Sequence, residues 1–529
     1  MRLSDWDLQQ IDATFLRLLC WSSLLALIVM LVDDLKEARD RLNQNSRNSS
    51  RPPSSEPPWQ GGEPSGERTQ DAQNPIGAKA SEGANDEASQ GAEAKEISQA
   101  QGNEGGAGTE KETKKKGTPG RGQGMKGYGR KVLLPLSGEE VHRPQRCSDC
   151  GKALEPSAFV ASTAHYVLDL VVKMAGLAGL ELTHVKHIYG QITCDCGHVN
   201  CTEPGRCAAE AEWKVALSEW HLVGPTLASL IVCLSQRLRG SRRLVQEFLN
   251  DWFGVYLCTS TINQCLHEAG RAVAPVEDQL AAEINQAELV FADETTWKEG
   301  GVVLWLWVFC SATVTLFLVG ARSKQIIQNL LSDDFAGWLM SDGYHVYRQY
   351  LKRVRCWAHL VRKARGLAES LEKDCAQPFG EAALALLKEL MKAVYQAREG
   401  PPVDLHRQYS EPLAQFKALC EHYRDCPHEK TRALAREFLN DWDVIWSVLK
   451  YPWLPLTNNE AERALRHWVI VRRICQGTRT KEGTRAFALL ASVIETCRKR
   501  GISPWPYIAE VITQRRKGNP APPLPATAA

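Results

Sequence analysis

The sequence predicts a multidomain protein whose largest part is an α/β core. Three runs rich in β-branched and aromatic residues (LVFADETTW, VVLWLWVFC and TVTLFLVG) lie within residues 289–320, separated only by KEGG and SA. This spacing predicts an antiparallel β-meander. A helical segment, the short strand GWLMSD and a Leu- and Ala-rich helical stretch over residues 368–450 come next. At 529 residues the chain is too long for one hydrophobic core, and roughly three or four domains would be usual.

An apolar run over residues 15–32 has two interpretations, a membrane span and a self-associating helix. The run has about the minimum length that crosses a bilayer, but it contains Arg17 and two serines. Its apolar residues also follow a heptad that continues into DDLKEARDRL, where no membrane helix would extend. The heptad positions are Trp21, Ile28, Leu35 and Leu42 on one side of the seam, and Leu24, Leu31 and Ala38 on the other. The sequence therefore favours a coiled-coil helix over residues 1–45, a homo-oligomer and no membrane partner.

Residues 46–131 have the composition of a flexible tether. Gly, Ser, Glu, Gln and Ala dominate, and Trp59 is the single aromatic residue before Tyr128, so the segment cannot bury enough apolar surface to offset the entropy of ordering. Acidic residues outnumber basic ones over residues 47–110, whereas residues 111–131 are basic, an asymmetry that the net charge of +2 conceals. The basic end either lies along a phosphate backbone or is a solvated end of the linker.

Two short cysteine pairs predict a zinc-binding domain over residues 132–210. The pairs occur in CSDCG and CDCGH, where a glycine after each pair permits a tight turn, and together they supply the four thiolates of a tetrahedral Zn²⁺ site. The predicted ligands are Cys147, Cys150, Cys194 and Cys196, with His198, Cys201 and Cys207 as nearby substitutes. The alternative is that these are ordinary free thiols. Most of the 17 cysteines are scattered singly and no secretory signal is evident, so we expect reduced thiols and a cytoplasmic location.

Residues 211–285 are predicted to be helical, with a basic stripe. The stripe consists of Arg237, Arg239, Arg242 and Arg243. The segment FGVYLCTSTINQCLHEAG resembles the second half of a helix-turn-helix, whose recognition helix would enter the major groove of DNA. We expect Arg242 and Arg243 to contact DNA. A plain helical support domain is the alternative.

Two aspartates stand at the ends of apolar, strand-like runs: Asp293 in VFADETTW and Asp342 in LMSDGYHVY. Glu294, next to the first, points to the opposite face of a strand. Taken singly, each aspartate has a structural explanation, because Asp342 could cap a turn and Asp293 could pair with an arginine. Together with a third acid, carboxylates in such settings are what a site needs to bind two Mg²⁺ ions beside a phosphodiester.

The third acid, Glu462, lies in NNEAERALRHWVIVRR, a predicted helix with several arginines. Glu460 is about 200° away around the helix axis, so the two glutamates cannot face one site. Glu460 is placed to pair with Arg463, whereas Glu462 lies at the edge of the apolar stripe, where an acid needs a partner such as a metal. Arg466 and Arg473 fall within about 40° of Glu462 and suit phosphate contacts. All three arginines are candidate DNA-binding residues, with pairing to the helix glutamates as the alternative.

Several motifs resemble, in the same order, those of insertion-sequence-66-type transposases. They are QNSRNSSRPPSS, PGRGQGMKG, the two cysteine pairs, ADET, SDGY, CWAH, NNEAERALR and LLASVIETCRKRGISPWPYI, and they extend over residues 43–508. The resemblance implies an RNase H-like catalytic core over residues 286–480 with an Asp-Asp-Glu triad. The triad corresponds to Asp293, Asp342 and Glu462. The resemblance also makes residues 368–450 a helical insertion and leaves 481–529 as a C-terminal helical segment and tail.

Some details of the resemblance bear on the triad. Cys356 and His359 match the family's Cys-x-x-His feature, but two ligands are too few for a closed zinc site, so packing is the favoured interpretation. Thr457 stands where the family usually has aspartate, and Ile474 where it has asparagine. These departures leave the triad intact, alter the surroundings of Glu462 and put full activity in question.

The sequence as a whole predicts a DNA transposase. Two Mg²⁺ ions held by the triad would activate water to cut at the ends of a mobile element, and then the freed 3′-hydroxyl to attack target DNA. The zinc module and helical region would recognise terminal inverted repeats, the coiled coil would pair protomers, and accessory proteins of the same element are further expected partners. One alternative is a zinc-containing DNA-binding protein with an inactive transposase core. Another is a membrane-anchored cytoplasmic protein.

Overall fold

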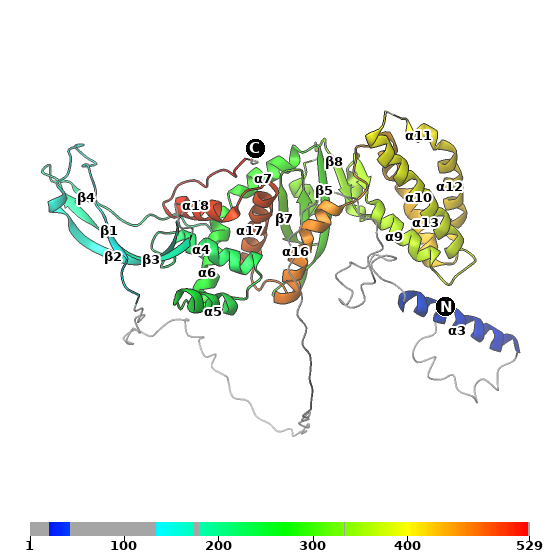
Figure 1. Cartoon of the computed structure of the whole chain (residues 1–529), viewed down its shortest axis with the longest axis horizontal. Coiled ribbons are helices and arrows are strands. Elements are labelled where there is room, and N and C mark those ends of the chain that lie inside the picture. Colours follow the sequence, from blue (N-terminus) through cyan, green and yellow to red (C-terminus); the bar gives the residue numbers. More distant parts are fainter. Residues whose placement is uncertain (1–20, 43–133, 174–178, 333, 402, 527–529) are drawn as a thin grey trace, which may run out of the picture. The chain divides into compact units, whose positions relative to one another are not determined.

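The computed structural model describes residues 21–42, 134–173, 179–332, 334–401 and 403–526 (Figure 1). The predicted tether over residues 46–131 lies outside the described residues, as do residues 1–20 of the predicted coiled coil. The described chain forms two β-sheets together with many helices, which confirms a mixed α/β fold.

The N-terminal apolar segment contains the helix α3 (Trp21–Leu42). Trp21, Ile28 and Leu35, which belong to the predicted seam, expose much of their side chains within the described chain. Self-association would bury such an apolar stripe, so the helix supports the coiled coil, which stays a prediction. In the part of the chain that the structure describes, no helix is both long enough and apolar enough to cross a membrane.

The cysteine-rich region forms a four-stranded sheet. Its elements are β1 (Gly138–His142), the 3-10 helix η3 (Pro156–Ala158), β2 (Val160–Lys173), β3 (Gly179–Thr193) and β4 (Val199–Cys201). The strand order is β1-β3-β2, and β4 also pairs with β3. Because β1 runs parallel to β3, the two cysteine pairs, which follow these two strands in the chain, meet at the same end of the sheet.

A helical region comes next. Its elements are α4 (Pro225–Val232), the π-helical turn η4 (Cys233–Arg237), α5 (Arg242–Phe253), α6 (Thr259–Val273) and α7 (Val276–Asn285). The Ser241 side chain caps the start of α5, and Gly254, with φ +64°, ends it. The first turn of α6 is exposed at Thr259 and Ser260, whereas residues 268–273 are all buried. The pair α5–α6 therefore has the order of a helix-turn-helix, but most of α6 is a core helix.

Five strands form the central sheet (green in Figure 1). They are β5 (Leu289–Glu299), β6 (Val302–Cys310), β7 (Thr315–Gly320), β8 (Trp338–Ser341) and β9 (Arg353–Arg355), with α8 (Lys324–Leu330) and η5 (His345–Gln349) in the connections. The strand order is β7-β6-β5-β8-β9. Strands β5, β6 and β7 are antiparallel, which confirms the predicted meander. Strands β8 and β9 extend the sheet in parallel beyond β5.

Three helices end the described chain: α16 (Asn459–Cys475), α17 (Lys481–Lys499) and α18 (Pro504–Arg516). Side-chain hydroxyls of α17 satisfy the edge strand β7, because the N–H groups of Thr315 and Phe317 donate to Thr496 Oγ1 at 3.0 Å and Ser492 Oγ at 2.8 Å. An edge strand covered in this way offers fewer unpaired groups to another chain.

Both faces of the central sheet are buried. Trp307 and Phe309 of β6 belong to the largest hydrophobic core, which includes residues of α4–α7. Leu306 and Val308 of the same strand pack on the opposite face with Trp468 of α16. Because successive side chains alternate between faces, coverage on both sides explains why this strand is apolar over residues 306–310, whereas Val302 and Val303 at its start are exposed.

Between β9 and α16 the chain is helical and has its own core (yellow in Figure 1). The helices are α9 (Trp357–Ala368), α10 (Ala376–Glu399), α11 (Leu405–Gln408), α12 (Ser410–His422), η6 (Tyr423–Asp425), α13 (Glu429–Asn440), α14 (Trp442–Ile445) and α15 (Ser447–Lys450). The segment 368–450 is therefore helical, as predicted. Its core includes Met340 of β8 and Val354 of β9, so it packs directly on the end of the sheet.

Candidate active site

Asp293 lies in the middle of β5, not at its end as the sequence predicted, and Asp342 directly follows the neighbouring parallel strand β8. β5 and β8 pair in register at Phe291 and Met340, and each aspartate follows two residues later in the chain. Since side chains repeat their direction every two residues along a strand, both aspartates extend toward the same side of the sheet. The junction between β5 and β8 thus brings together two acids that are distant in the sequence.

The charges of these acids are coupled. Burial, followed by the nearby charges of Asp342, Glu294 and Glu462, holds the pKa of Asp293 well above its usual range. Asp293 Oδ1 accepts a hydrogen bond from the backbone N–H of Glu294 at 2.9 Å. Asp342 Oδ1 accepts from the N–H of Tyr344 at 2.9 Å, so its predicted turn-capping role is present as well. Half-buried carboxylates that hinder the ionisation of a neighbouring acid provide a favourable setting for cations.

Glu294 has partners of its own. Its carboxylate accepts hydrogen bonds from Arg322 Nη2 at 2.8 Å and from the Tyr347 hydroxyl at 2.7 Å. The Arg322 guanidinium lies over the rings of Trp305 and Tyr344, 4.2 and 4.1 Å from their centroids. Burial, and then the charge of Asp342, raise the pKa of Glu294. Glu294 therefore has structural partners but also lies near the aspartates, and its exclusion from the metal site stays a prediction.

Asn458 fixes the start of α16 against β5. Its side-chain amide donates to the carbonyl of Ala292 at 2.9 Å, and its backbone N–H donates to Cys356 Sγ at 3.2 Å. Because Ala292 immediately precedes Asp293, this contact holds the first turn of α16, which carries Glu462, beside the aspartate. Asn458 is fully buried, and the sequence alone assigned it no role.

The two glutamates of α16 have different surroundings. Glu460 lies 3.7 Å from Arg463, which confirms the predicted pair. Burial raises the pKa of Glu462, the positive charge of Arg362 opposes the rise, and the charge of Asp342 adds to it. Glu462 is therefore the glutamate of this helix that lies in the electrostatic neighbourhood of the aspartates.

His359 of the Cys-x-x-His feature and Arg362 lie beside Glu462. Its Oε1 is 3.9 Å from His359 Nδ1 and 3.7 Å from Arg362 Nη2. Burial lowers the pKa of His359 to about 3, and its buried Nδ1 has no hydrogen-bond partner among the described residues. Packing describes the fully buried Cys356 but not His359, which borders the acid. The spacing of Cys356 and His359 was the only sequence signal for this contact.

The ligand atoms of Cys356, His359 and Glu462 all lie within 4.8 Å of one another. Among the described residues, the carboxylates of the full triad do not form such a close group. Glu462 is the member on a long side chain at the start of a helix. Among the three acids, it is the one that groups with Cys356 and His359.

The arginines of α16 divide into two kinds. Arg466 and Arg473 are exposed, as the phosphate-contact prediction requires, and Arg463 is exposed although it pairs with a glutamate. Arg472, to which the sequence gave no role, donates to Thr295 Oγ1 at 2.8 Å. This hydrogen bond anchors the C-terminal part of α16 to β5.

The two arginines predicted to contact DNA from α5 also differ. Arg242 donates to Ser235 Oγ at 2.9 Å and to Asn263 Oδ1 at 3.3 Å, and burial lowers its pKa. Arg243 is exposed, with its Nε 3.3 Å from Glu247. Consecutive helix residues are about 100° apart, so one arginine faces the protein and the other faces solvent. The DNA-contact prediction is better supported for Arg243.

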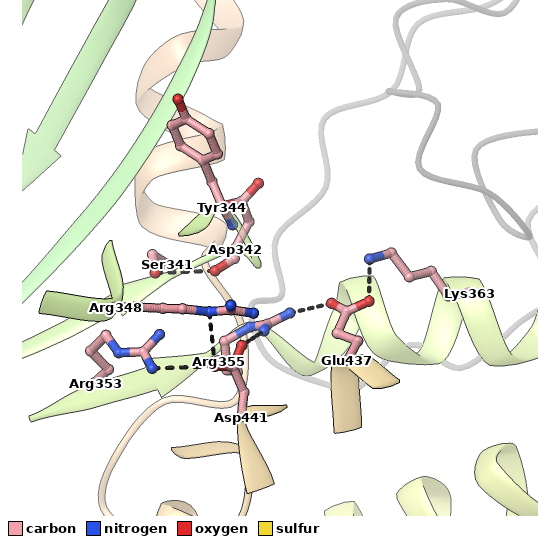
Figure 2. A network of polar contacts seen from close by, with 9 residues as sticks. All are labelled: Ser341, Asp342, Tyr344, Arg348, Arg353, Arg355, Lys363, Glu437 and Asp441. Atoms are coloured by element: carbon pink, nitrogen blue, oxygen red, sulfur yellow. Dashed lines mark hydrogen bonds and ion pairs between the residues drawn. The ribbon is translucent and has the colours of Figure 1, made fainter. Parts of the chain in front are cut away.

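A network of ion pairs joins the helical insertion to the β8–β9 edge (Figure 2). Asp441, at the end of α13, contacts Arg348, Arg353 and Arg355, and Glu437 connects Arg355 to Lys363. Both Arg355 and Asp441 are almost completely buried. Charges removed from water in this way need their partners, so the network fixes the insertion to the strands that flank Asp342.

Gly343 lies between Asp342 and this network. A β-carbon at this position would be 2.6 Å from Arg355 Nη2 and 2.9 Å from Glu437 Oε1. Only glycine therefore fits without moving buried charged groups, which gives a physical reason for the Asp-Gly sequence after β8.

Replacing Asp441 with asparagine is expected to lower the free energy of unfolding by about 3–5 kcal/mol, because it leaves buried arginines without their counter-charge. Urea unfolding followed by tryptophan fluorescence measures the change. Asp425→Asn is the matched control, since Asp425 pairs with Arg436 on an exposed part of the same insertion and should contribute at most about 1 kcal/mol. Equal effects of the two substitutions would contradict the role of the network.

The four predicted cysteines form one group. Cys147 Sγ lies 3.6 Å from Cys196 Sγ, Cys150 Sγ lies 3.6 Å from Cys194 Sγ, and the four atoms are all within 4.8 Å of one another. Zinc–sulfur bonds of roughly 2.3 Å place tetrahedral ligands about 3.8 Å apart. The sulfur separations thus fit a zinc ion without rearrangement.

The turns around the sulfurs also suit a metal. Gly151 and Gly197 have φ of +72° and +88°, so the glycines allow the tight turns that the sequence predicted. Although the pKa values of Cys150 and Cys196 are raised, the latter to about 12, the backbone N–H of Cys150 is the main cause that lowers the pKa of Cys147 to about 6. A thiol that ionises readily is a better metal ligand.

Cys194→Ser is expected to remove one bound zinc ion per chain, because a tetrahedral structural site needs all four ligands. Zinc content after dialysis, measured by plasma mass spectrometry, gives the result. Cys201→Ser is the control, since Cys201 is exposed on β4 and lies outside the group. Equal zinc content in the two variants would rule out the cysteine site.

Residues 222–486 match the sequence model described as Transposase IS66 family, a match that covers half of the chain. The chain belongs to the IS66 transposase family. The matched residues include the three acids, the helical insertion and α16. Residues 8–88 match a second family, which is described only as one of unknown function.

Similar proteins in Sinorhizobium fredii (strain NBRC 101917 / NGR234) are named as uncharacterized proteins. The uncharacterized protein y4jO is 27% identical over 155 residues, which are 29% of this chain and 46% of that protein. The uncharacterized protein y4qI is 24% identical over 341 residues, which are 58% of this chain and 63% of that protein. The chain thus spans less than two thirds of the length of these relatives.

Proposed function

We propose that the protein is a DNA transposase that cuts DNA at the ends of an insertion sequence and joins those ends to target DNA. Membership of the IS66 transposase family supports a transposase-type function. What supports the proposal is that Asp293 of β5, Asp342 after β8 and Glu462 of α16 are electrostatic neighbours. After burial, the charges of Asp342 and Glu462 raise the pKa of Asp293, and the charge of Asp342 raises the pKa of Glu462.

The three acids would hold two Mg²⁺ ions. Their fit rests on burial and mutual repulsion, which disfavour the ionised carboxylates unless cations are nearby. Bound Mg²⁺ would supply Lewis-acid activation of the attacking oxygen and charge stabilisation at phosphorus. Asn458 and Arg472 position α16, and the neutral His359 ring borders Glu462 without adding a positive charge.

The mixed sheet supports an RNase H-like core, because Asp293 in the middle of β5 and Asp342 just after the neighbouring strand β8 lie on adjacent strands, and helices cover both faces. The exposed Arg466 and Arg473 would contact phosphates beside the acids, and Arg243 with the first turn of α6 would contact the element's terminal repeats. The cysteine module would be a Zn²⁺-stabilised part of the DNA-recognition surface. Protomers would pair through α3, and the expected location is the cytoplasm.

The test uses the full-length protein and DNA that carries the sequences flanking its gene. We expect Mg²⁺-dependent nicking at the ends of the element and joining of the freed 3′ ends to a second DNA. DNA binding without either product, with Mg²⁺ or Mn²⁺ present, would favour the alternative, a DNA-binding protein with an inactive core. The substitutions at Thr457 and Ile474 make this alternative worth testing directly.

A further inference from the structure

The four-stranded sheet carries a second group of metal-ligating side chains. Glu140 and His142 are two residues apart on β1, so they face the same side of the sheet. In the parallel pairing of β1 with β3, Glu140 stands opposite His187. The ligand atoms of these three residues all lie within 4.8 Å of one another. Roughly 20 Å of extended strand separates His187 from Cys194, so the group is distinct from the cysteine cluster.

The separations within this group match a metal site. His142 Nε2 lies 3.0 Å from His187 Nδ1, and His187 Nδ1 lies 3.4 Å from Glu140 Oε2. Glu140 Oε1 lies 3.9 Å from His142 Nε2. Zinc bonds of roughly 2.0–2.1 Å to nitrogen and oxygen place tetrahedral ligands about 3.3 Å apart. Two imidazoles and one carboxylate are also a ligand set that zinc uses, with a fourth position left for water or another ligand.

The imidazole rings are held in place by aromatic stacking. The His142 ring stacks on Tyr189, with centroids 4.3 Å apart and planes 7° apart. The His187 ring stacks on His165 of β2, with centroids 5.4 Å apart. His165 is only 7% exposed, and within the described residues its Nδ1 has no hydrogen-bond partner. Rings fixed in this way lose little freedom when they bind an ion.

Strand β1 has few other attachments. Four of its five residues are exposed and the fifth is half-buried, so the strand gains little from apolar burial. Apart from its backbone pairing with β3, it has an ion pair between Glu139 and Lys186 at 2.9 Å and a hydrogen bond from the Thr202 hydroxyl to the His142 carbonyl at 2.7 Å. β1 is also the first strand after the predicted tether.

We propose that Glu140, His142 and His187 bind a divalent transition-metal ion of the Zn²⁺ type, and that this ion clamps β1 onto β3. Imidazole nitrogens favour zinc and its first-row neighbours over Mg²⁺ and Ca²⁺, which prefer oxygen ligands. The group is on the four-stranded sheet and shares no residue or strand with the three acids. The proposal of this metal site is therefore independent of the transposase proposal.

The test compares Glu140→Gln with Glu139→Gln in the full-length protein, freed of any affinity tag. Successive strand residues face opposite sides of the sheet, so Glu139→Gln changes charge equally without touching the site. After dialysis against Zn²⁺ and removal of free ion, we expect two zinc ions per chain in the wild type and in Glu139→Gln. Glu140→Gln should retain one, or bind the second at least about tenfold more weakly.

Replacing zinc with Co²⁺ distinguishes the loss of one metal site from unfolding of the whole module. Cysteine thiolates give Co²⁺ a strong near-ultraviolet charge-transfer band, so a Glu140→Gln protein that keeps this band still has its cysteine site folded. Hydrogen exchange of the β1 amides should be faster in Glu140→Gln than in Glu139→Gln. A wild-type protein with a single zinc ion that Cys194→Ser removes would overturn the proposal, as would equal metal content and equal exchange in the two glutamate variants.

Discussion

Asp293→Asn is expected to reduce DNA cleavage by at least about a thousandfold while DNA binding persists. Metal ions contribute several kcal/mol of charge stabilisation in the transition state, and each 1.36 kcal/mol is about tenfold in rate. The amide is close in size to the carboxylate, so the fold should be retained. Cleavage of end-labelled DNA and a gel-shift assay measure the two activities separately.

Asp293→Asn should increase the stability of the folded protein, although it reduces cleavage. Burial and neighbouring charges raise the pKa of Asp293 in the folded protein, whereas in the unfolded chain this aspartate ionises at about pH 4. The folded state therefore binds the proton more tightly, and its stability falls as pH rises from about 4 toward the raised folded-state pKa. In EDTA at neutral pH, Asp293→Asn should raise Tm by about 2–4 °C, which corresponds to about 1 kcal/mol in a domain of this size.

Glu288→Gln is the matched control for Asp293→Asn, because Glu288 is exposed just before β5. It should leave cleavage, Tm and the pH dependence of Tm unchanged. A lower Tm for Asp293→Asn in EDTA would contradict this prediction. It would mean that the ionised aspartate stabilises the fold through its partners and does not destabilise it through burial and repulsion from neighbouring acids.

Glu462→Gln is expected to reduce cleavage by at least about a hundredfold, whereas Glu460→Gln should stay within about twofold of the wild type. The difference follows from position, since Glu462 lies in the neighbourhood of Asp342 and Arg362 and Glu460 pairs with Arg463 near the surface. Losing one metal ligand removes at least about 2.7 kcal/mol of stabilisation on this account. Initial rates at saturating Mg²⁺ for the two variants give the comparison.

The glutamate pair tests the assignment on α16 because both substitutions remove one charge from the same helix turn. Strong inhibition by Glu460→Gln with normal cleavage by Glu462→Gln would reverse the assignment. Full activity of both variants would remove α16 from the catalytic site.

Local periodicity was enough to predict part of this arrangement. The two-residue repeat of a strand separates Asp293 from Glu294, and the structure gives Glu294 its own partners, Arg322 and Tyr347. Helix phase separates Glu460 from Glu462 in the same way. The cysteine pairs were predictable because each pair and its glycine form one local turn.

Contacts between distant segments were not predictable from periodicity. The hydrogen bond from Asn458 to Ala292 arises only when the start of α16 packs beside β5, and the contact of His359 with Glu462 arises only when α9 lies beside α16. Helix phase could have distinguished Arg242 from Arg243, but the direction of the core was unknown before the packing of α5 was seen. The clearance at Gly343 depends on the buried Arg355, whose partners come from the helical insertion.

The most direct test of the central proposal is to measure Mn²⁺ binding to the full-length protein. The electron paramagnetic resonance signal of the free ion reports how much Mn²⁺ stays unbound. Mn²⁺ prefers the same oxygen ligands as Mg²⁺, so the wild type should bind ions that Mg²⁺ displaces. Asp293→Asn, Asp342→Asn and Glu462→Gln should each weaken that binding by at least about tenfold, and Glu460→Gln should not. Unchanged Mn²⁺ binding in all three triad variants would contradict a shared metal site formed by these acids.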